Sequence, residues 1–128
     1  MLKKRIGIEA IEKYWSWSKR LSNYFKIPTT LIIPDGCEKI GNRVFECCEK
    51  LKEVVISRSV KSIGTCSFGG CNRLEEVIIP ENVDVIGRDA FCYCSSATII
   101  LKKAESEFKE IGKWAFRECK DVKEEIGS

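Results

Sequence analysis

Apolar residues recur along most of this chain with a period of 23 residues. Each period begins with a short run of β-branched and aliphatic residues, and a second apolar pair follows a few residues later. Runs this short, two of them followed directly by Pro34 or Pro80, are typical of β-strands. The pattern therefore predicts four strand-and-turn units, with strands at 31–33, 54–56, 77–79 and 98–101.

The residues of each predicted turn repeat with the same spacing as the strands. Glycine, phenylalanine and cysteine recur at Gly41, Gly64, Gly87 and Gly112, at Phe45, Phe68, Phe91 and Phe116, and at Cys48, Cys71, Cys94 and Cys119. One unit cannot bury its own apolar face, so neighbouring units must stack. We therefore expect one column of phenylalanines and another of cysteines. The glycines should mark a positive φ or a close approach between backbones.

The complete unit reads Cys-x-x-Leu-x-x-Ile-x-Ile-Pro-x-x-Val-x-x-Ile-Gly-x-x-Ala-Phe, and residues 74–97 are the closest copy. In this form the unit resembles the BspA-like, 23-residue class of leucine-rich repeats, and the resemblance covers about residues 30–122. It implies a leucine-rich-repeat β-solenoid of α/β repeat units, stacked in a right-handed coil, and a role in protein–protein binding. The family shares no catalytic residues, so the resemblance implies a protein that is not an enzyme.

On this basis the chain divides into three parts. Residues 1–29 are expected to form an N-terminal cap, and residues 123–128 a polar tail. The four repeats between them are predicted at 30–51, 52–74, 75–97 and 98–122. In the fourth repeat, strict spacing directs Leu101 outward and Lys102 inward, and residues 103–107 lengthen the unit. We therefore expect the register to slip locally there.

The expected cap has two interpretations. Residues 6–26 have the periodicity of an amphipathic helix, with apolar side chains at Ala10, Tyr14, Trp17, Leu21 and Tyr24. Residues 6–11 also match the Ile-Gly-x-x-Ala-Phe segment, with Ile11 in the place of phenylalanine. The two can coexist as a degenerate half-repeat that continues into a capping helix, because solenoid ends need atypical caps.

Composition adds limits on function and location. The 128 residues carry a net charge of +3, too small to imply a nucleic-acid binder by itself, although residues 1–26 hold seven basic and two acidic side chains. No apolar run approaches the ~18 residues of a membrane span. Glu9, Glu12 and Lys13 interrupt any signal-peptide core after the basic start. We expect a cytoplasmic protein, or a secreted or cell-surface one if a leader has been removed.

The chain contains eight cysteines and no histidine. The close pairs Cys47-Cys48 and Cys92-x-Cys94 lack the C-x₂₋₄-C spacing of structural zinc sites, so we expect no metal and no cofactor. Four cysteines belong to the repeat and are expected as buried thiols, with disulfides as the alternative. No histidine is present to activate a cysteine nucleophile, so no catalytic residue is assigned.

Strand alternation suggests a binding surface. If Val54 points inward, Val55 points outward, and the equivalent positions form an exposed aliphatic row of Ile32, Val55, Ile78 and Leu101, flanked by Glu53 and Glu76. A solvated sheet face is expected to be polar. The row is therefore interpreted as a partner or dimer surface. The alternatives are cover by the chain's own N-terminus, or no function beyond strand propensity.

A second candidate surface is the basic, aromatic N-terminal segment, with Lys13, Lys19, Arg20 and Lys26 around Trp15. Such side chains can contact phosphates, stack on bases or lie at a membrane surface. The alternative is that the aromatic residues only cover the end of the solenoid.

We therefore expect a non-enzymatic protein–protein interaction module that acts as an inhibitor or adaptor of a protein partner. A homodimer through the aliphatic row is a further expectation. A short relative or fragment of a cell-surface adhesin is the alternative, and binding of nucleic acid or another anionic surface comes third.

Overall fold

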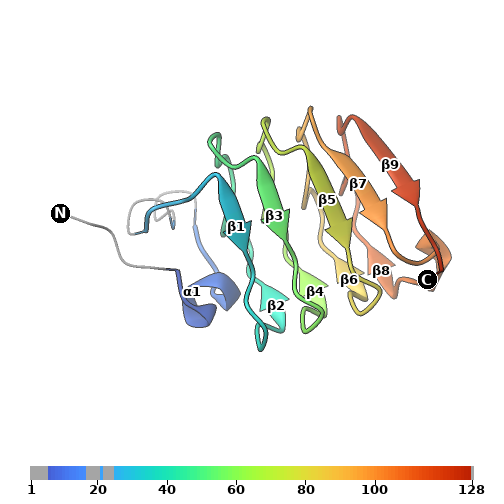
Figure 1. Ribbon diagram of the computed structural model, residues 1–128, viewed down its shortest axis with the longest axis horizontal. Helices are drawn as coiled ribbons and strands as arrows, with labels where there is room; N and C mark the ends of the chain where they lie inside the picture. Colours follow the sequence, from blue (N-terminus) through green and yellow to red (C-terminus); the bar gives the residue numbers. More distant parts are fainter. Residues whose placement is uncertain (1–5, 17–20, 22–24, 128) are drawn as a thin grey trace.

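The computed structural model describes residues 6–16, 21 and 25–127. In these residues the chain winds into a β-solenoid of about four turns with a small helix at its N-terminal end (Figure 1). The first row of strands comprises β1 Thr30–Ile32, β3 Glu53–Val55, β5 Glu76–Ile79, β7 Thr98–Leu101 and β9 Asp121–Glu124. The second row comprises β2 Lys39–Ile40, β4 Ser62–Ile63, β6 Val85–Ile86 and β8 Glu110–Ile111.

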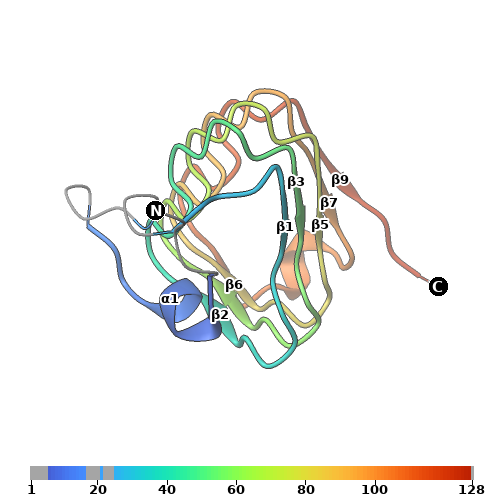
Figure 2. The ribbon, with the colours of Figure 1, turned by 60° about the vertical axis from the view of Figure 1, so that its left-hand side comes forward.

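All strand pairs are parallel. Strands β2, β4, β6 and β8 form one sheet, β1 pairs with β3, and β5, β7 and β9 form a third group. The Glu75 amide donates to the Lys52 carbonyl at 3.0 Å and links the β3 turn to the β5 turn. Figure 2 looks more nearly along the solenoid and shows the two rows of strands on different sides of the coil. The core lies between them.

The predicted phenylalanine column is confirmed. Ring centroids are 5.3 Å apart between Phe45 and Phe68, 5.2 Å between Phe68 and Phe91, and 6.1 Å between Phe91 and Phe116. The first three rings are fully buried, whereas Phe116 in the last turn is half-buried. Each ring covers the flank of its neighbour, as expected for units that bury their apolar faces only by stacking.

The predicted cysteine column is also present. The thiols of Cys71, Cys94 and Cys119 each donate a hydrogen bond, at 3.1 Å, to the carbonyl of a column phenylalanine one turn earlier. All eight cysteines lie in the described part of the chain, and none forms a disulfide. The thiols thus satisfy backbone carbonyls inside an otherwise apolar core.

The repeated glycines allow close backbone approach and do not adopt positive φ. A Cβ atom placed on Gly87 would lie 2.6 Å from the Thr65 amide nitrogen of the preceding turn, and the other three glycines are similarly crowded. Left-handed residues stand elsewhere, at the second and sixth positions after each of these glycines. They are Arg43, Cys66, Asp89 and Trp114, then Cys47, Gly70, Tyr93 and Glu118.

The register of the fourth repeat slips, as expected, but the outward orientation predicted for Leu101 is wrong. Ile78 pairs with Ile100 and Ile79 pairs with Leu101, so Leu101 points into the core and is fully buried. The reason is a missing residue before the strand, since Ala97 precedes the inward Ile99 by two residues instead of three. The outward place therefore belongs to Ile100.

Extra residues after β7 bring β8, in the second row of strands, back into register with β6. They include the 3₁₀ helix η2, Glu105–Glu107, after which Phe108 is buried in the core. Val85 then pairs with Glu110, 25 residues later. Lys102, predicted to point inward, instead approaches Glu125 at 4.0 Å in a partly exposed ion pair.

The helix predicted over residues 6–26 is much shorter in the structure. Helix α1 spans Ile8–Glu12, and Lys13 is already extended at φ −79° and ψ 150°. The chain leaves the helix because it joins the first turn, where Gly41 donates to the Ile11 carbonyl at 2.7 Å. The Ile40 carbonyl accepts from Gly64 in the same way, so Ile11 corresponds to Ile40 of the next turn. The prediction that Ile11 occupies the phenylalanine position of the repeat is therefore wrong.

Candidate functional site

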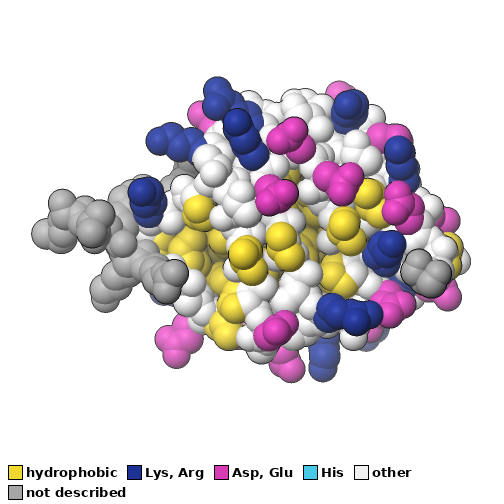
Figure 3. Space-filling view, viewed as in Figure 1, with side chains coloured by type: hydrophobic (Ala, Val, Ile, Leu, Met, Phe, Trp, Pro, Cys, Tyr) yellow, Lys and Arg dark blue, Asp and Glu magenta, His cyan; other side chains and the backbone are white. Residues whose placement is uncertain are grey.

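The exposed apolar residues predicted on the first row of strands are present on β1, β3 and β5. Ile32, Val55 and Ile78 are 67%, 49% and 47% exposed, and Ile32 pairs directly with Val55. We call these three residues the aliphatic stripe. Figure 3 views this face and shows a band of hydrophobic side chains across the same strands. Their exposure means that the described N-terminal residues do not cover the stripe.

The stripe ends sooner than the sequence predicts. Leu101 is buried, and Ile100, which faces outward in its place, is only 6% exposed. On the next strand the paired residue is Lys123. The surface is therefore apolar over three strands and becomes charged at β9.

Acidic side chains border the stripe on one side. Glu53 pairs with Thr30, and Glu76 pairs with Thr98, so the four residues form the neighbouring outward row. Both glutamates are exposed, and neither forms an ion pair within the part of the chain that the structure describes. A partner that covers the stripe would therefore meet carboxylates along this border.

The N-terminal candidate surface has less support. Trp15 is only 7% exposed, packs edge-to-face on Phe25 at 6.5 Å, and donates its indole N–H to the Ala10 carbonyl at 2.8 Å. Lys13 lies 4.9 Å from the Trp15 ring and Lys26 is exposed, whereas Lys19 and Arg20 fall outside the described residues. A ring buried in this way closes the end of the core and offers no face for stacking on a base.

Sequence reasoning missed a groove across the second row of strands. The glycines Gly41, Gly64, Gly87 and Gly112 lack side chains and line a shallow groove of about 620 Å³. Its other lining residues include Lys39, Ser62, Val85 and Glu110, and Asn42, Thr65, Arg88 and Lys113. We call it the glycine groove. The column of glycines was visible in the sequence, but it was interpreted only as a feature of the backbone.

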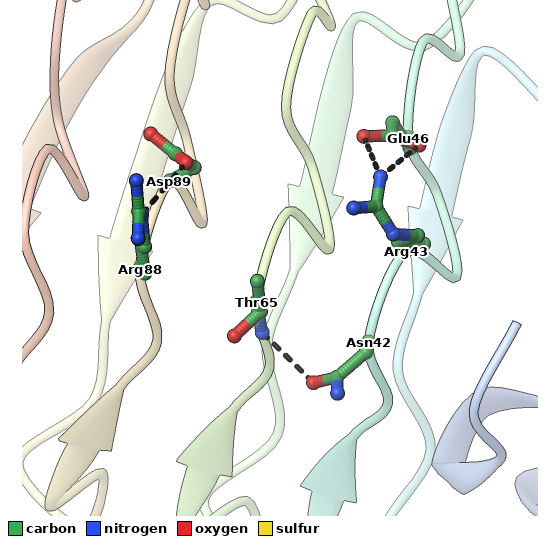
Figure 4. Close-up of polar contacts among 6 residues, drawn as sticks. All are labelled: Asn42, Arg43, Glu46, Thr65, Arg88 and Asp89. Atoms are coloured by element: carbon green, nitrogen blue, oxygen red, sulfur yellow. Dashed lines mark hydrogen bonds and ion pairs between the residues drawn. The ribbon is translucent and has the colours of Figure 1, made fainter. Parts of the chain in front are cut away.

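Local contacts order one rim of the glycine groove (Figure 4). The Thr65 amide donates to Asn42 Oδ1 at 2.9 Å, which links two successive turns. Arg43 forms an ion pair with Glu46 at 3.0 Å, and Arg88 lies 3.5 Å from Asp89. The Arg88 side chain nevertheless remains 59% exposed.

The thiols outside the column are poor nucleophile candidates. Burial, reinforced by the negative charge of Asp89, raises the pKa of Cys92 to about 11. Burial likewise raises the pKa of Cys66. A thiol with a raised pKa is protonated at neutral pH and unreactive. Within residues 6–16, 21 and 25–127, no group of histidine, cysteine or acidic residues is arranged to hold a metal ion.

Parallel strand-and-turn units of about 23 residues, stacked through columns of leucine, isoleucine and phenylalanine, define a leucine-rich-repeat solenoid. The sequence matches the family described as "BspA type Leucine rich repeat region (6 copies)" over residues 22–125, and the chain belongs to this family. Neither the comparison with curated proteins nor that with solved structures gave a match.

Membership of this family indicates a role in protein–protein interaction or adhesion, and the family is typically non-enzymatic. Among the described residues, no helix has the length and apolar character needed to cross a membrane.

Proposed function

We propose that this protein binds another protein and that the aliphatic stripe forms the centre of the contact surface. The observation that carries the proposal is the exposure of three aliphatic side chains, Ile32, Val55 and Ile78, on the outer face of the first row of strands. An open sheet normally presents polar side chains to water. Covering the stripe would remove apolar surface from water and so stabilise a complex.

The size of the stripe limits how it can act. Three aliphatic side chains that are about half to two-thirds exposed present an apolar area of roughly 200–300 Å². At ~25 cal/mol per Å², burial of this area contributes about 5–8 kcal/mol. Association itself costs an estimated 4–15 kcal/mol. The stripe alone is therefore too small for tight binding, and the acidic border of Glu53 and Glu76 or another surface must also contact the partner.

A protein with this surface would act as an inhibitor or adaptor. The strands are held in a continuous stacked core, so the stripe presents its side chains without a further ordering step. Such preorganisation lowers the entropic cost of binding. Blocking or bridging a partner needs only a rigid complementary surface, which suits a chain of a typically non-enzymatic family.

The cysteine column bears on the compartment in which this happens. Its thiols donate hydrogen bonds to backbone carbonyls. Reducing compartments preserve thiols, whereas oxidising ones favour disulfides. We therefore propose a cytoplasmic location. Thiol counting on protein from its native host tests this, and bridged cysteines would instead favour the cell-surface, adhesin-like alternative.

The binding proposal is tested by affinity capture from the native host with Val55→Arg, Ile78→Arg and a control, Asn72→Arg. Asn72 is exposed in a turn outside the stripe, and its replacement adds the same charge. We expect a protein retained by the unaltered chain and by Asn72→Arg to be lost with both stripe variants. Equal retention by all four forms would exclude the stripe as the binding surface.

A homodimer is the second outcome to examine, because the same stripe would then face its own copy. Sedimentation velocity of the unaltered chain and of Ile78→Arg distinguishes a homodimer from a complex with another protein. A dimer that dissociates in the variant places a second copy on the stripe.

A further inference from the structure

Two exposed aromatic residues in the last two turns are surrounded by basic side chains. Lys113 Nζ lies 4.3 Å from the centre of the Trp114 ring, and the guanidinium carbons of Arg88 and Arg117 lie 4.9 and 5.3 Å from it. Arg117 also lies 5.5 Å from the Tyr93 ring. We call Arg88, Tyr93, Lys113, Trp114 and Arg117 the cation–aromatic cluster.

The cluster does not follow from the needs of the fold. Trp114 is 41% exposed and Tyr93 is 51% exposed, so neither ring is needed to fill the core. Both residues are left-handed, at φ 62° and 60°. The left-handed conformation itself belongs to the fold, because it recurs at the same two positions of every turn. An exposed aromatic side chain is not required there, since none of the other six left-handed positions carries one.

The charges of the cluster are poorly compensated. Within the described residues Arg88 forms an ion pair with Asp89 at 3.5 Å, while Lys113 and Arg117 form none. Even when the exposed Glu118 next to Arg117 is included, the cluster keeps net positive charge. The surface is therefore electrostatically complementary to an anionic partner.

The geometry distinguishes between anionic partners. An arginine that stacks on a ring uses the face of its guanidinium and leaves the N–H donors at its edge available for bidentate contact with a carboxylate. The same stacking covers the Trp114 ring, so a nucleic-acid base would first have to displace a cation. The adjoining glycine groove, which shares Arg88 and Lys113, also contains Glu12 and Glu110. A nucleic-acid strand, charged along its whole length, would meet these carboxylates if it continued into the groove, whereas a short acidic segment can remain on the cluster.

We propose that the cation–aromatic cluster is a second protein-binding surface and that it recognises an acidic segment of a partner protein. Carboxylates of the segment would bind Arg117, Lys113 and Arg88, whose charged groups the Trp114 ring holds together. Arginine, tryptophan and tyrosine are the residues most enriched at energetically dominant interface positions. The cluster lies on the turns, away from the aliphatic stripe, so one molecule would contact two protein surfaces.

The probe for this proposal is a fluorescently labelled synthetic peptide in which leucines are separated by pairs of glutamates. Its binding to the full chain is followed by anisotropy at low and at physiological salt. We expect saturable binding that weakens with salt. Arg117→Gln and Trp114→Ala should each weaken it roughly tenfold, the loss typical of a dominant interface residue. Lys123→Gln on β9, which removes the same charge outside the cluster, should leave the affinity unchanged.

Three results would overturn the proposal. They are absence of binding at low salt, equal weakening by Lys123→Gln and Arg117→Gln, and equal affinity for a peptide with glutamine in place of glutamate. Tighter binding of a single-stranded oligonucleotide, also sensitive to Trp114→Ala, would assign the cluster to nucleic acid instead. Trp114 is exposed, so Trp114→Ala should keep the circular dichroism spectrum of the unaltered chain. Val55→Arg should not affect the peptide, which separates this test from that of the stripe.

Discussion

Replacement of Phe68 by alanine tests whether stacking of the repeats holds this protein together. Phe68 is fully buried and lies between two rings, 5.3 Å from Phe45 and 5.2 Å from Phe91. Truncation of a buried phenylalanine costs about 3–5 kcal/mol, and each aromatic pair contributes about 0.5–1.5 kcal/mol beyond burial. We expect Phe68→Ala to lower the free energy of unfolding by about 4–8 kcal/mol.

The matched comparison is Phe116→Ala at the end of the same column. Phe116 is half-buried and has one ring neighbour, Phe91, at 6.1 Å. Its removal should cost about half as much, roughly 2–4 kcal/mol. Urea unfolding followed by circular dichroism measures both losses, with the slope of the transition reporting whether the unfolding remains two-state. The reasoning is refuted if Phe116→Ala is as destabilising as Phe68→Ala.

Because Phe68→Ala removes a large share of the ~5–15 kcal/mol that stabilises a typical domain, it can leave too little folded protein to measure. Double variants with leucine avoid this problem. Phe45→Leu and Phe68→Leu affect touching rings and should be non-additive by about 0.5 kcal/mol or more, whereas Phe45→Leu and Phe91→Leu should add within about 0.5 kcal/mol. Equal coupling in both pairs would contradict nearest-neighbour stacking.

Four further substitutions and conditions test other features. Gly87→Ala should destabilise the fold by more than ~1 kcal/mol in urea unfolding, because its Cβ would meet the Thr65 backbone and cannot be relieved by side-chain rotation. Glu118→Gly should raise the free energy of unfolding by about 1 kcal/mol, because glycine adopts the left-handed conformation without strain. Leu101→Ala should lower the free energy of unfolding by about 2–5 kcal/mol in the same assay. A loss below ~0.5 kcal/mol would indicate that Leu101 lies on the surface, as strict repeat spacing predicts. Burial raises the pKa of Cys92 from 9.0 to about 11, so the folded state retains a proton that the unfolded state loses, and stability should fall as pH rises from 9.0 towards 11. Because the pKa values of Cys37, Cys66, Cys71 and Cys94 are raised as well, Cys92→Ala should make that part of the pH profile less steep without flattening it.

The stacked core was predictable because the same apolar residues recur at the same positions of every turn. Phe45, Phe68 and Phe91 occur at one spacing, and only a column buries all of them. The limits of this reasoning appear where the period breaks. Deletion of one residue before Ile99 reverses which of Ile100 and Leu101 faces the core, since strand side chains alternate at every residue. The spacing shows that the register slips, but it does not show whether the strand begins before or after the slip.

The N-terminal segment does not form the long helix that its periodicity predicts, for a different reason. Its apolar residues recur at helical intervals, yet hydrogen bonds to Gly41 and Asn42 hold residues 11–15 along the first turn. Helical propensity is a weak preference that such tertiary contacts override. Of the predicted apolar face, Leu21 is buried but Tyr14 is 65% exposed, and Trp17 and Tyr24 lie outside the described residues. The apolar pattern therefore identified only part of what is covered.

The candidate surfaces were predictable in part. The stripe follows from alternation along single strands, which is why Ile32, Val55 and Ile78 were found. The cation–aromatic cluster joins residues from two turns that are more than twenty positions apart, and its rings point outward because of left-handed backbones at Tyr93 and Trp114. No periodic signal in the sequence reports such a conformation at a non-glycine residue.

The lengthened corner after β7 has a consequence for what this architecture tolerates. There the chain takes up additional residues as a 3₁₀ helix, while Phe108 and Glu110 return to their proper neighbours. The corresponding corners after β1, β3 and β5 occupy the same edge of the coil, outside both rows of strands (Figure 1). Foreign peptide loops grafted at that edge would protrude in a regular array, one per turn, which makes the coil a scaffold for multivalent display.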